Sequence, residues 1–251
     1  MGHAGLRPAA DVTAPGAGVE AWLADLAADA EPLSPAHYEV DLTEEERRRA
    51  AGYLNGEDAR LFLRSRLVVR RLLAARLGEA PGAVRLARTR GGKPYLPDHP
   101  ELKVSWSRSE DLLLLGISDR GALGVDLERI RLIPSATQVL ASLYPALPPQ
   151  ADGAGPEFFF SAWTLLEAAV KATGRGLAQG VGDVTLSFPA RGGAALLGIA
   201  RTGGEPWAAS TALLEAPATT DARLMASFVT RGQLGRIWLR RWPPEGSAGD
   251  G

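Results

Sequence analysis

The sequence predicts an α+β protein built as a pseudo-dimer of two similar lobes, each with a long helix packed on a small antiparallel sheet. Apolar side chains recur every three or four positions in residues 57–78 and again in residues 158–177, which indicates two long helices. After each helix the apolar period shortens to two, as is typical of strands. Since no residue-level repeat accompanies this duplication, the two lobes share a pattern only.

The chain is expected to divide where Pro and Gly accumulate and periodicity is lost. In order, the expected units are a flexible leader at 1–18, an N-terminal lobe at 19–130, a connecting loop at 131–156, a C-terminal lobe at 157–242 and a disordered tail at 243–251. The connecting loop contains a short helical segment near 137–144 before a Pro-rich and Gly-rich stretch.

Each element has its own local signal. An edge strand is expected near 19–26, and Thr43 is placed to cap a helix whose first turn carries three glutamates. In the helix at 57–78 the apolar stripe faces the core and the arginines face outward, and Gly78 ends the helix. Period-two segments follow this helix up to Glu128, and others follow the second long helix through the C-terminal lobe.

Composition limits the classes of partner. Lys and Arg number 28 against 29 Asp and Glu, so the net charge of −1 provides no overall attraction to nucleic acid or to an anionic membrane. Cysteine is absent, which excludes a thiol nucleophile and a Cys-based zinc site. With no long apolar run and no secretory leader, we expect a cytoplasmic protein.

Acidic side chains recur at two places that point to one site. Trp163, Glu167 and Lys171 are spaced by four and share one helix face; the ordinary interpretation of the last two is an exposed ion pair worth ~0.3–0.5 kcal/mol. Asp126 and Glu128 end a predicted strand, where alternate residues point to one face about 6.6–6.8 Å apart. Three carboxylates without His or Cys favour Mg²⁺, with Mn²⁺ as the alternative, over zinc.

Basic side chains near these carboxylates suit a phosphate ligand. A magnesium site beside Lys171, Arg108 and Lys93 would neutralise a pyrophosphate as its P–O bond breaks. The familiar phosphate-binding and dinucleotide-binding glycine motifs are absent, and so is a Ser-His-Asp arrangement. The run Arg47 to Arg49 is either a solvated helix face or an anion site.

These motifs together resemble the larger, surfactin-type 4′-phosphopantetheinyl transferases, in order and spacing, over about residues 40–180. The segments that carry the resemblance are RGGKPYLP, VSWSRSEDLLLLGIS, GVDLE and WTLLEAAVKATGRGL. The resemblance implies a monomer with CoA bound between two lobes. It also implies Mg²⁺-assisted transfer of phosphopantetheine from CoA to a serine of an acyl or peptidyl carrier protein of polyketide, non-ribosomal peptide or fatty-acid synthesis.

By this resemblance Asp126 and Glu128 are metal ligands, and Glu167 is the third acidic group, as a ligand or as the base that activates the serine. Lys171 matches the lysine on the phosphates, and Lys93 matches the lysine of the family's Gly-Lys-Pro turn. Ser107 and Arg108 belong to the CoA-binding segment, and one of Arg47, Arg48 and Arg49 is expected at the 3′-phosphate of CoA.

The chain departs from the family pattern at two positions. The family usually has Ser-His-Ser where this chain has Ser107, Arg108 and Ser109, and Lys-Glu where it has Leu166 and Glu167. Arginine binds phosphate but cannot exchange protons as imidazole does, and leucine removes a cation. These departures keep a second interpretation open: a transferase-like protein with lost or altered activity that docks on a carrier protein or synthase, or a repurposed biosynthetic enzyme.

Overall fold

A computed structural model describes residues 7–8, 18–28, 35–144, 155–189, 193–216 and 222–243 of the chain. The leader expected at 1–18 and the tail expected at 243–251 lie largely outside these ranges. Among the described residues, no helix combines the length and apolarity needed to cross a bilayer.

Helices and strands both contribute extensively, which confirms the mixed α+β class. The helices are α1 (Pro35–Asp41), α2 (Glu44–Ala51), α3 (Gly56–Leu77), α4 (Ala136–Leu143), α5 (Pro156–Thr173) and α6 (Leu177–Gly180), with 3₁₀ turns η1 (Pro81–Ala83) and η3 (Val181–Asp183). The strands are β1 (Arg7–Pro8), β2 (Gly18–Asp25), β3 (Ala87–Arg88), β4 (Pro94–Tyr95), β5 (Lys103–Ser109), β6 (Leu112–Ser118), β7 (Leu123–Arg129), β8 (Val184–Ser187), β9 (Ala195–Ile199), β10 (Trp207–Glu215), β11 (Arg223–Arg231) and β12 (Arg236–Trp242).

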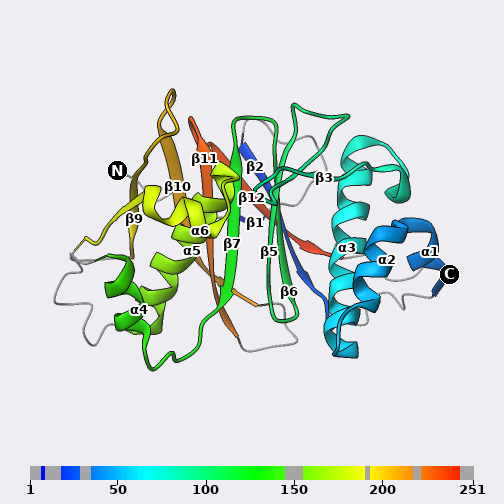
Figure 1. Ribbon diagram of the computed structural model, residues 1–251, viewed down its shortest axis with the longest axis horizontal. Coiled ribbons are helices and arrows are strands. Elements are labelled where there is room, and N and C mark those ends of the chain that lie inside the picture. Colours follow the sequence, from blue (N-terminus) through cyan, green and yellow to red (C-terminus); the bar gives the residue numbers. More distant parts are fainter. Residues whose placement is uncertain are drawn as a thin grey trace.

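Two sheets form the centre of the molecule, with helices to either side (Figure 1). The larger sheet has the order β1-β12-β2-β6-β5, in which β12 runs parallel to both β1 and β2 while the β2-β6 and β6-β5 pairs are antiparallel. The smaller sheet, β10-β11-β7, is antiparallel throughout. Short hairpins, β3-β4 and β8-β9, complete the strand pairing of the described residues.

The strands cross the expected boundary between lobes. The last strand, β12, pairs with β2 in the sheet formed by the first half of the chain, and β7 pairs with β11 from the second half. Consequently β2 is an interior strand, whereas the sequence had suggested an edge. Both faces of β2 are buried, as is typical of an interior strand. Val19 and Leu23 pack in one core cluster, and Ala24 packs in another.

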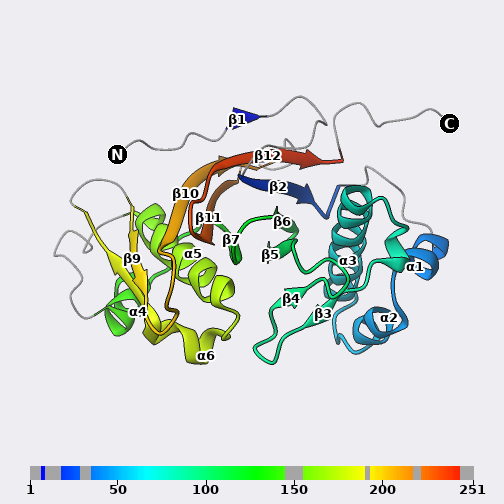
Figure 2. The same cartoon turned by 90° about the horizontal axis from the view of Figure 1, so that it is seen from above.

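Each long helix packs on its sheet through its apolar face. Side chains of α3 such as Val69 and Leu73 meet Leu113 and Leu115 of β6 in one buried cluster. Asn55 caps the start of α3, and Gly78 ends the helix in the left-handed conformation. The end at Gly78 was predicted from the sequence. Viewed from above, α3 and α5 stand on opposite sides of the central strands, and the β3-β4 hairpin lies between them (Figure 2).

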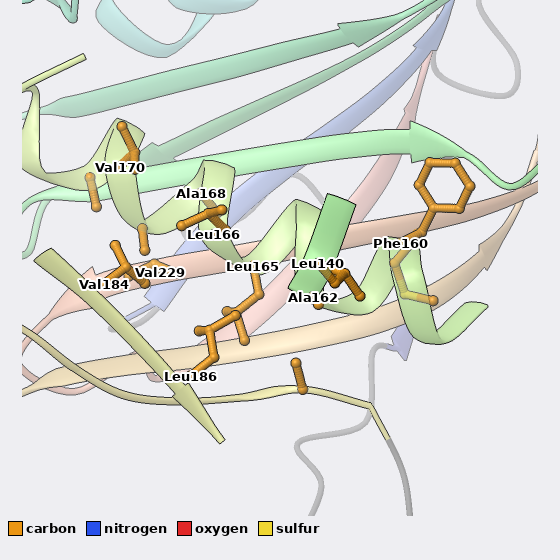
Figure 3. Close-up of a cluster of buried hydrophobic side chains, with 14 of the residues drawn as sticks. Leu140, Phe160, Ala162, Leu165, Leu166, Ala168, Val170, Val184, Leu186 and Val229 are labelled. Atoms are coloured by element: carbon orange, nitrogen blue, oxygen red, sulfur yellow. The ribbon is translucent and has the colours of Figure 1, made fainter. Parts of the chain in front are cut away.

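The apolar side of α5 is almost entirely enclosed. Figure 3 shows the buried cluster around Leu165, Leu166 and Val170, which also receives Leu186 from β8 and Val229 from β11. Trp163 packs at the edge of this cluster, with its ring stacked on Phe159 at a centroid distance of 6.0 Å. Because most of its faces are covered, α5 has a narrow strip left over, and that strip carries Glu167 and Lys171.

Candidate functional site

A glycine brings the acidic strand against the helix. Gly124 of β7 lies so close to α5 that a Cβ built on it would overlap the carbonyl oxygen of Ala168 and the backbone nitrogen of Ala172. The sequence indicated a close approach at this glycine, and the neighbour is α5 itself. The contact places Asp126, two residues further along β7, within reach of Lys171.

β5 and β7 are edge strands of different sheets and share no backbone ladder. Serine side chains at alternate positions of β5 link the two strands instead. The amide of Val125 donates to Ser105 Oγ at 3.0 Å, and the amide of Arg129 donates to Ser109 Oγ at 3.0 Å. Between them, Ser107 Oγ donates to Asp126 Oδ1 at 2.6 Å. We call these three serines the serine seam; it fixes the strand that carries the acids.

Asp126 is the most enclosed of the three acids. Its Oδ1 accepts from Ser107 and from the Lys171 ammonium, whose Nζ lies 2.5 Å away and also donates to Ser107 Oγ at 2.9 Å. Its Oδ2 is buried and has no hydrogen-bond partner. Burial raises the pKa of Asp126, while the Lys171 charge and the Ser107 hydroxyl oppose that rise. An unpartnered buried carboxylate oxygen is costly unless a ligand or cation meets it.

The other two acids repel Asp126 and each other. Burial raises the pKa of Glu128, against the effect of a 2.8 Å hydrogen bond from Ser109, and the Asp126 charge adds to the rise. Burial likewise raises the pKa of Glu167, and Asp126 and Glu128 raise it further. Within the described residues, no three His, Cys, Asp or Glu side chains are already gathered at ligand distance. The three acids therefore lie near one another without forming a closed cage.

The burial of Glu167, together with repulsion from the other two acids, leads to a stability prediction. A carboxyl group whose pKa is higher in the folded protein than in the unfolded chain destabilises the folded protein when it is ionised. The free energy of unfolding therefore falls as the pH rises from the unfolded pKa through the folded pKa. Glu167→Gln removes this penalty. We expect the melting temperature at pH 7.5 to rise by about 2–4 °C, equivalent to about 1 kcal/mol, and the gain to disappear near pH 4.

The exposed Glu215→Gln is the matched control for this measurement and should leave the melting temperature unchanged at both pH values. The prediction fails if the melting temperature of Glu167→Gln is still raised at pH 4, or is lowered at pH 7.5. Either result would show that the ionised Glu167 carboxylate does not destabilise the folded protein.

Two pockets open beside the acids and share a wall. The first encloses about 240 Å³ and is lined by Glu167, Lys171 and the turn at Gly91. The second encloses about 390 Å³, and Arg88, Pro94 and Trp106 line both pockets. The second pocket is lined by arginines from α2, α3 and the segment that follows: Arg49, Arg66, Arg70, Arg85 and Arg88.

Arg66 is the least satisfied cation of the second pocket. Its side chain is 8% exposed, and its Nε is buried without a partner. Its guanidinium lies over the Trp106 ring at 4.4 Å. Burial and the neighbouring Arg88 lower the pKa of Arg66 to about 10, so it stays charged at neutral pH. A buried, crowded arginine of this kind is typical of an anion site.

The arginine run of α2 separates in the structure. Arg47 Nη1 donates to backbone carbonyls, including Leu42 O at 2.6 Å, and so supports the end of α1. Arg48 is exposed and pairs with Glu44 on the helix surface. Of the three, Arg49 lines the second pocket, where its guanidinium carbon lies 5.3 Å from the centroid of the Phe62 ring. Arg48 therefore fits the solvated helix face, and Arg49 stays a candidate for the anion site.

Three other predicted residues lie as follows. Ser107 belongs to the serine seam and touches Asp126 and Lys171, so it supports the acids. Arg108 is exposed on the opposite side of β5, where its Nη1 donates to Glu110 O at 2.6 Å. Lys93 lines the first pocket, but its ammonium donates to three backbone carbonyls.

Leu166 is part of the core and does not line either pocket. It is 0% exposed and belongs to the cluster drawn in Figure 3. The substitution of leucine for the family's usual lysine therefore takes no charge out of the space around Glu167. Of the two departures that favoured an inactive protein, only Arg108 lies at the surface.

Sequence patterns missed the arginines of α3. They were expected on the outer face, yet Arg70 is 2% exposed, donates from Nε to Glu46 at 2.7 Å and reaches the carbonyl of Val84. Arg66 and Arg70 are spaced by four on a helix whose apolar residues surround them, and this spacing was the available signal. A charged pair inside an apolar stripe indicates a buried ligand or partner more often than solvent.

Comparison with known proteins gives consistent results over most of the chain. A family model described as 4′-phosphopantetheinyl transferase, N-terminal, matches residues 36–123, and one described as the 4′-phosphopantetheinyl transferase superfamily matches residues 122–223.

Individual relatives carry the same activity in their names. The chain is 33% identical to a 4′-phosphopantetheinyl transferase of Nostoc sp., over 55% of this chain and 62% of that protein. It is 32% identical to a Synechocystis sp. protein provisionally named for this activity, over 61% of this chain and 65% of that protein. A phosphopantetheinyl transferase of Thraustochytrium sp. is 29% identical over 73% and 70%. The matched segments thus span less than two thirds of the Nostoc and Synechocystis proteins.

Proposed function

We propose that the chain is a 4′-phosphopantetheinyl transferase, as the two matching family models support, and that it transfers the 4′-phosphopantetheine group of CoA to a serine of an apo carrier protein. One observation carries the proposal. Asp126, Glu167 and Lys171 come together from β7 and α5 beside a pocket whose far wall, Trp106, also bounds an arginine-lined pocket. This arrangement suits a ligand with several phosphates and one reacting P–O bond.

Five arginines line the second pocket against two glutamates, Glu45 and Glu46, so the charge there favours an anionic ligand such as the nucleotide end of CoA. Its nucleotide end, which carries a 3′-phosphate, would enter the second pocket, where Arg49 is exposed and Arg66 has an unpartnered Nε. Its pyrophosphate would pass Trp106 toward Lys171 in the first pocket. The peptide-like arm would then leave through the open mouth of that pocket.

A divalent cation, Mg²⁺ or Mn²⁺, fits the acidic residues. The candidate ligands Asp126, Glu128 and Glu167 offer oxygen atoms, which suit these ions, and Asp126 Oδ2 is an unpartnered buried acceptor. Asp126 and Glu128 would hold the ion, and Glu167 completes the acidic set. When bound, the ion would neutralise charge that develops on the pyrophosphate.

The chain's own residues supply the remaining steps. The carrier serine Oγ attacks the phosphorus atom next to the pantetheine arm, the bond from that phosphorus to the bridging oxygen breaks, and 3′,5′-ADP leaves with the electron pair. Glu167 accepts the serine proton, since its raised pKa is nearer neutrality than an ordinary glutamate's. Lys171 stabilises the negative phosphate oxygens, and Ser107 and Asp126 hold its ammonium in place.

We further propose that the chain is of the surfactin type and acts as a monomer, with the two halves as structural counterparts. Support comes from the two family models, which match adjacent segments of one chain. It also comes from the parallel roles of α3 and α5, each of which packs on one of the two central sheets. Carriers of polyketide, non-ribosomal peptide or fatty-acid synthesis are the proposed acceptors.

The decisive test of the function is a mass-shift assay. Purified chain, CoA and MgCl₂ are incubated with apo carrier proteins from each of these three kinds of synthase, and the carriers are weighed by intact-mass spectrometry. We expect at least one carrier to gain one phosphopantetheine per acceptor serine, and the gain to need both CoA and the divalent ion. If no carrier gains this mass at any concentration of CoA or metal, the chain is not a transferase.

The second pocket makes a prediction about affinity. Arg49→Gln should raise the KM for CoA by about 10–100-fold, because a hydrogen bond to a charged group is worth about 1.5–3 kcal/mol. Its melting temperature should stay at the wild-type value, since Arg49 is exposed. Steady-state kinetics with a fixed carrier measure this change.

Arg48→Gln is the matched control, one residue away on the same helix but outside both pockets. An equal rise in KM for both variants would mean that the general charge of α2 matters and that the second pocket does not bind the nucleotide end.

A further inference from the structure

The β3-β4 turn holds a lysine that the reaction scheme leaves unused. Lys93 Nζ donates to Leu123 O at 2.8 Å, to Lys171 O at 2.9 Å and to Ala172 O at 2.6 Å. These acceptors belong to the first residue of β7 and to the last turn of α5. An ammonium has three hydrogens, and each has an acceptor here, so none is left for a phosphate.

We propose that Lys93 is a positioning residue that clamps the C-terminal end of α5 onto the start of β7 and so places Lys171 opposite Asp126. The inference rests on the proposed function for its effect on the reaction, whereas the clamp itself is a property of the free protein. It assigns Lys93 a role different from the phosphate contact that its place in the Gly-Lys-Pro turn suggested.

Close backbone packing supports the clamp from the other side. A Cβ built on Gly91 would overlap the carbonyl oxygen of Gly174, the residue that ends α5. A Cβ on Gly174 would in turn lie 3.0 Å from Lys93 Cδ. The turn therefore lies directly on the end of the helix, and Figure 2 shows the β3-β4 hairpin reaching toward the side of the molecule that carries α5 and α6.

Electrostatics favour the same arrangement. The last carbonyls of a helix carry its negative dipole end and lack helical partners, and a lysine ammonium satisfies both needs. Burial lowers the pKa of Lys93 to about 8, so at neutral pH the side chain still carries its charge. The charge is matched by dipoles, because no carboxylate is paired with this ammonium among the described contacts.

The clamp acts on the site through one residue. Lys93 holds the backbone carbonyl of Lys171, while the Lys171 side chain extends to Asp126 and Ser107. It also holds Leu123, three residues before Asp126 on the same strand. The backbone on each side of the Lys171–Asp126 contact is therefore tied to a single ammonium.

Lys93→Met tests the clamp, since methionine keeps most of the apolar stem and loses all three hydrogen bonds. Hydrogen exchange on the free protein should show faster exchange of the amides near residues 171–174, and the melting temperature should fall by several degrees. In the transfer assay kcat should fall by about 10–100-fold, as for other residues that orient a reactive group, while the KM for CoA changes less than about twofold. Lys103→Met, at a lysine whose Nζ contacts only Pro100 O among the described hydrogen bonds, is the matched control.

A direct phosphate contact would give the opposite signature. In that case the KM for CoA would rise, while hydrogen exchange and melting of the free protein stayed at wild-type values, and that result overturns the clamp. Because both readouts on the free protein need no substrate, they remain valid even if the chain proves inactive toward every carrier.

Gly91→Ala provides a second variant if Lys93→Met does not fold. The added Cβ displaces the turn from Gly174 with Lys93 still present, so exchange near residues 171–174 should again accelerate. Gly182→Ala adds its methyl group to open space and should not affect exchange there. Unchanged exchange in Gly91→Ala would contradict the clamp.

Discussion

Asp126→Asn is expected to reduce the rate of phosphopantetheine transfer by at least about 10²–10³-fold while the protein stays folded. Asparagine keeps the shape of the side chain and can still accept from Ser107, but it removes the charge that faces Lys171 and the oxygen that is unpartnered in the wild type. Initial rates by intact-mass spectrometry measure the effect.

Metal binding provides an independent readout of the same variant. A ligand that binds only the folded state raises its melting temperature, so Mg²⁺ should stabilise the wild-type chain and should not stabilise Asp126→Asn. Asp119→Asn, at an exposed aspartate in the turn after β6, is the matched control for both measurements. If Asp126→Asn transfers at the wild-type rate, Asp126 is not part of the reacting site.

Leu166→Lys is expected to destabilise the protein by about 3–5 kcal/mol and to lower its melting temperature by about 10 °C. The introduced lysine would enter a cluster where Leu166 is 0% exposed and packs among apolar side chains from several elements. The side chains that form the cluster are apolar and offer an ammonium no hydrogen-bond acceptor, so its burial would be costly.

Two controls separate charge from shape. Leu166→Met, close to Leu166 in volume, should cost less than about 1.5 kcal/mol. Leu132→Lys introduces the same charge at a leucine that is 85% exposed and should have almost no effect. The melting temperatures of the three variants, measured by thermal unfolding, test this prediction. A Leu166→Lys variant as stable as the wild type, with faster transfer, would mean that this side of α5 opens to the pocket in solution.

Local patterns were sufficient for the elements but not for how they assemble. The period of three to four residues predicted α3 and α5, and the period of two predicted the strands, because each pattern records which faces of one element are buried. The position of β12 could not be predicted in this way. A strand's period does not specify its neighbour, and the pairing of β12 with β2 joins segments at opposite ends of the chain.

In the candidate site, too, positions within one element could be predicted, whereas contacts between elements could not. Glu167 and Lys171 belong to one helix and Asp126 and Glu128 to one strand, so fixed spacings placed each pair correctly, and Gly124 indicated a close neighbour. The contacts of Lys93 could not be predicted from the sequence. A lysine stem spans several ångströms, and its three acceptors are backbone atoms, which no residue pattern can mark.

The serine seam also bears on how the protein folds. Asp126 and Glu128 lie on a strand of one sheet, but their serine donors lie on a strand of the other. Until the sheets dock, both acids lack these hydrogen bonds and remain in water. Docking of the two sheets and formation of the acidic site are therefore coupled, and a variant in which the sheets fail to dock would lack these hydrogen bonds.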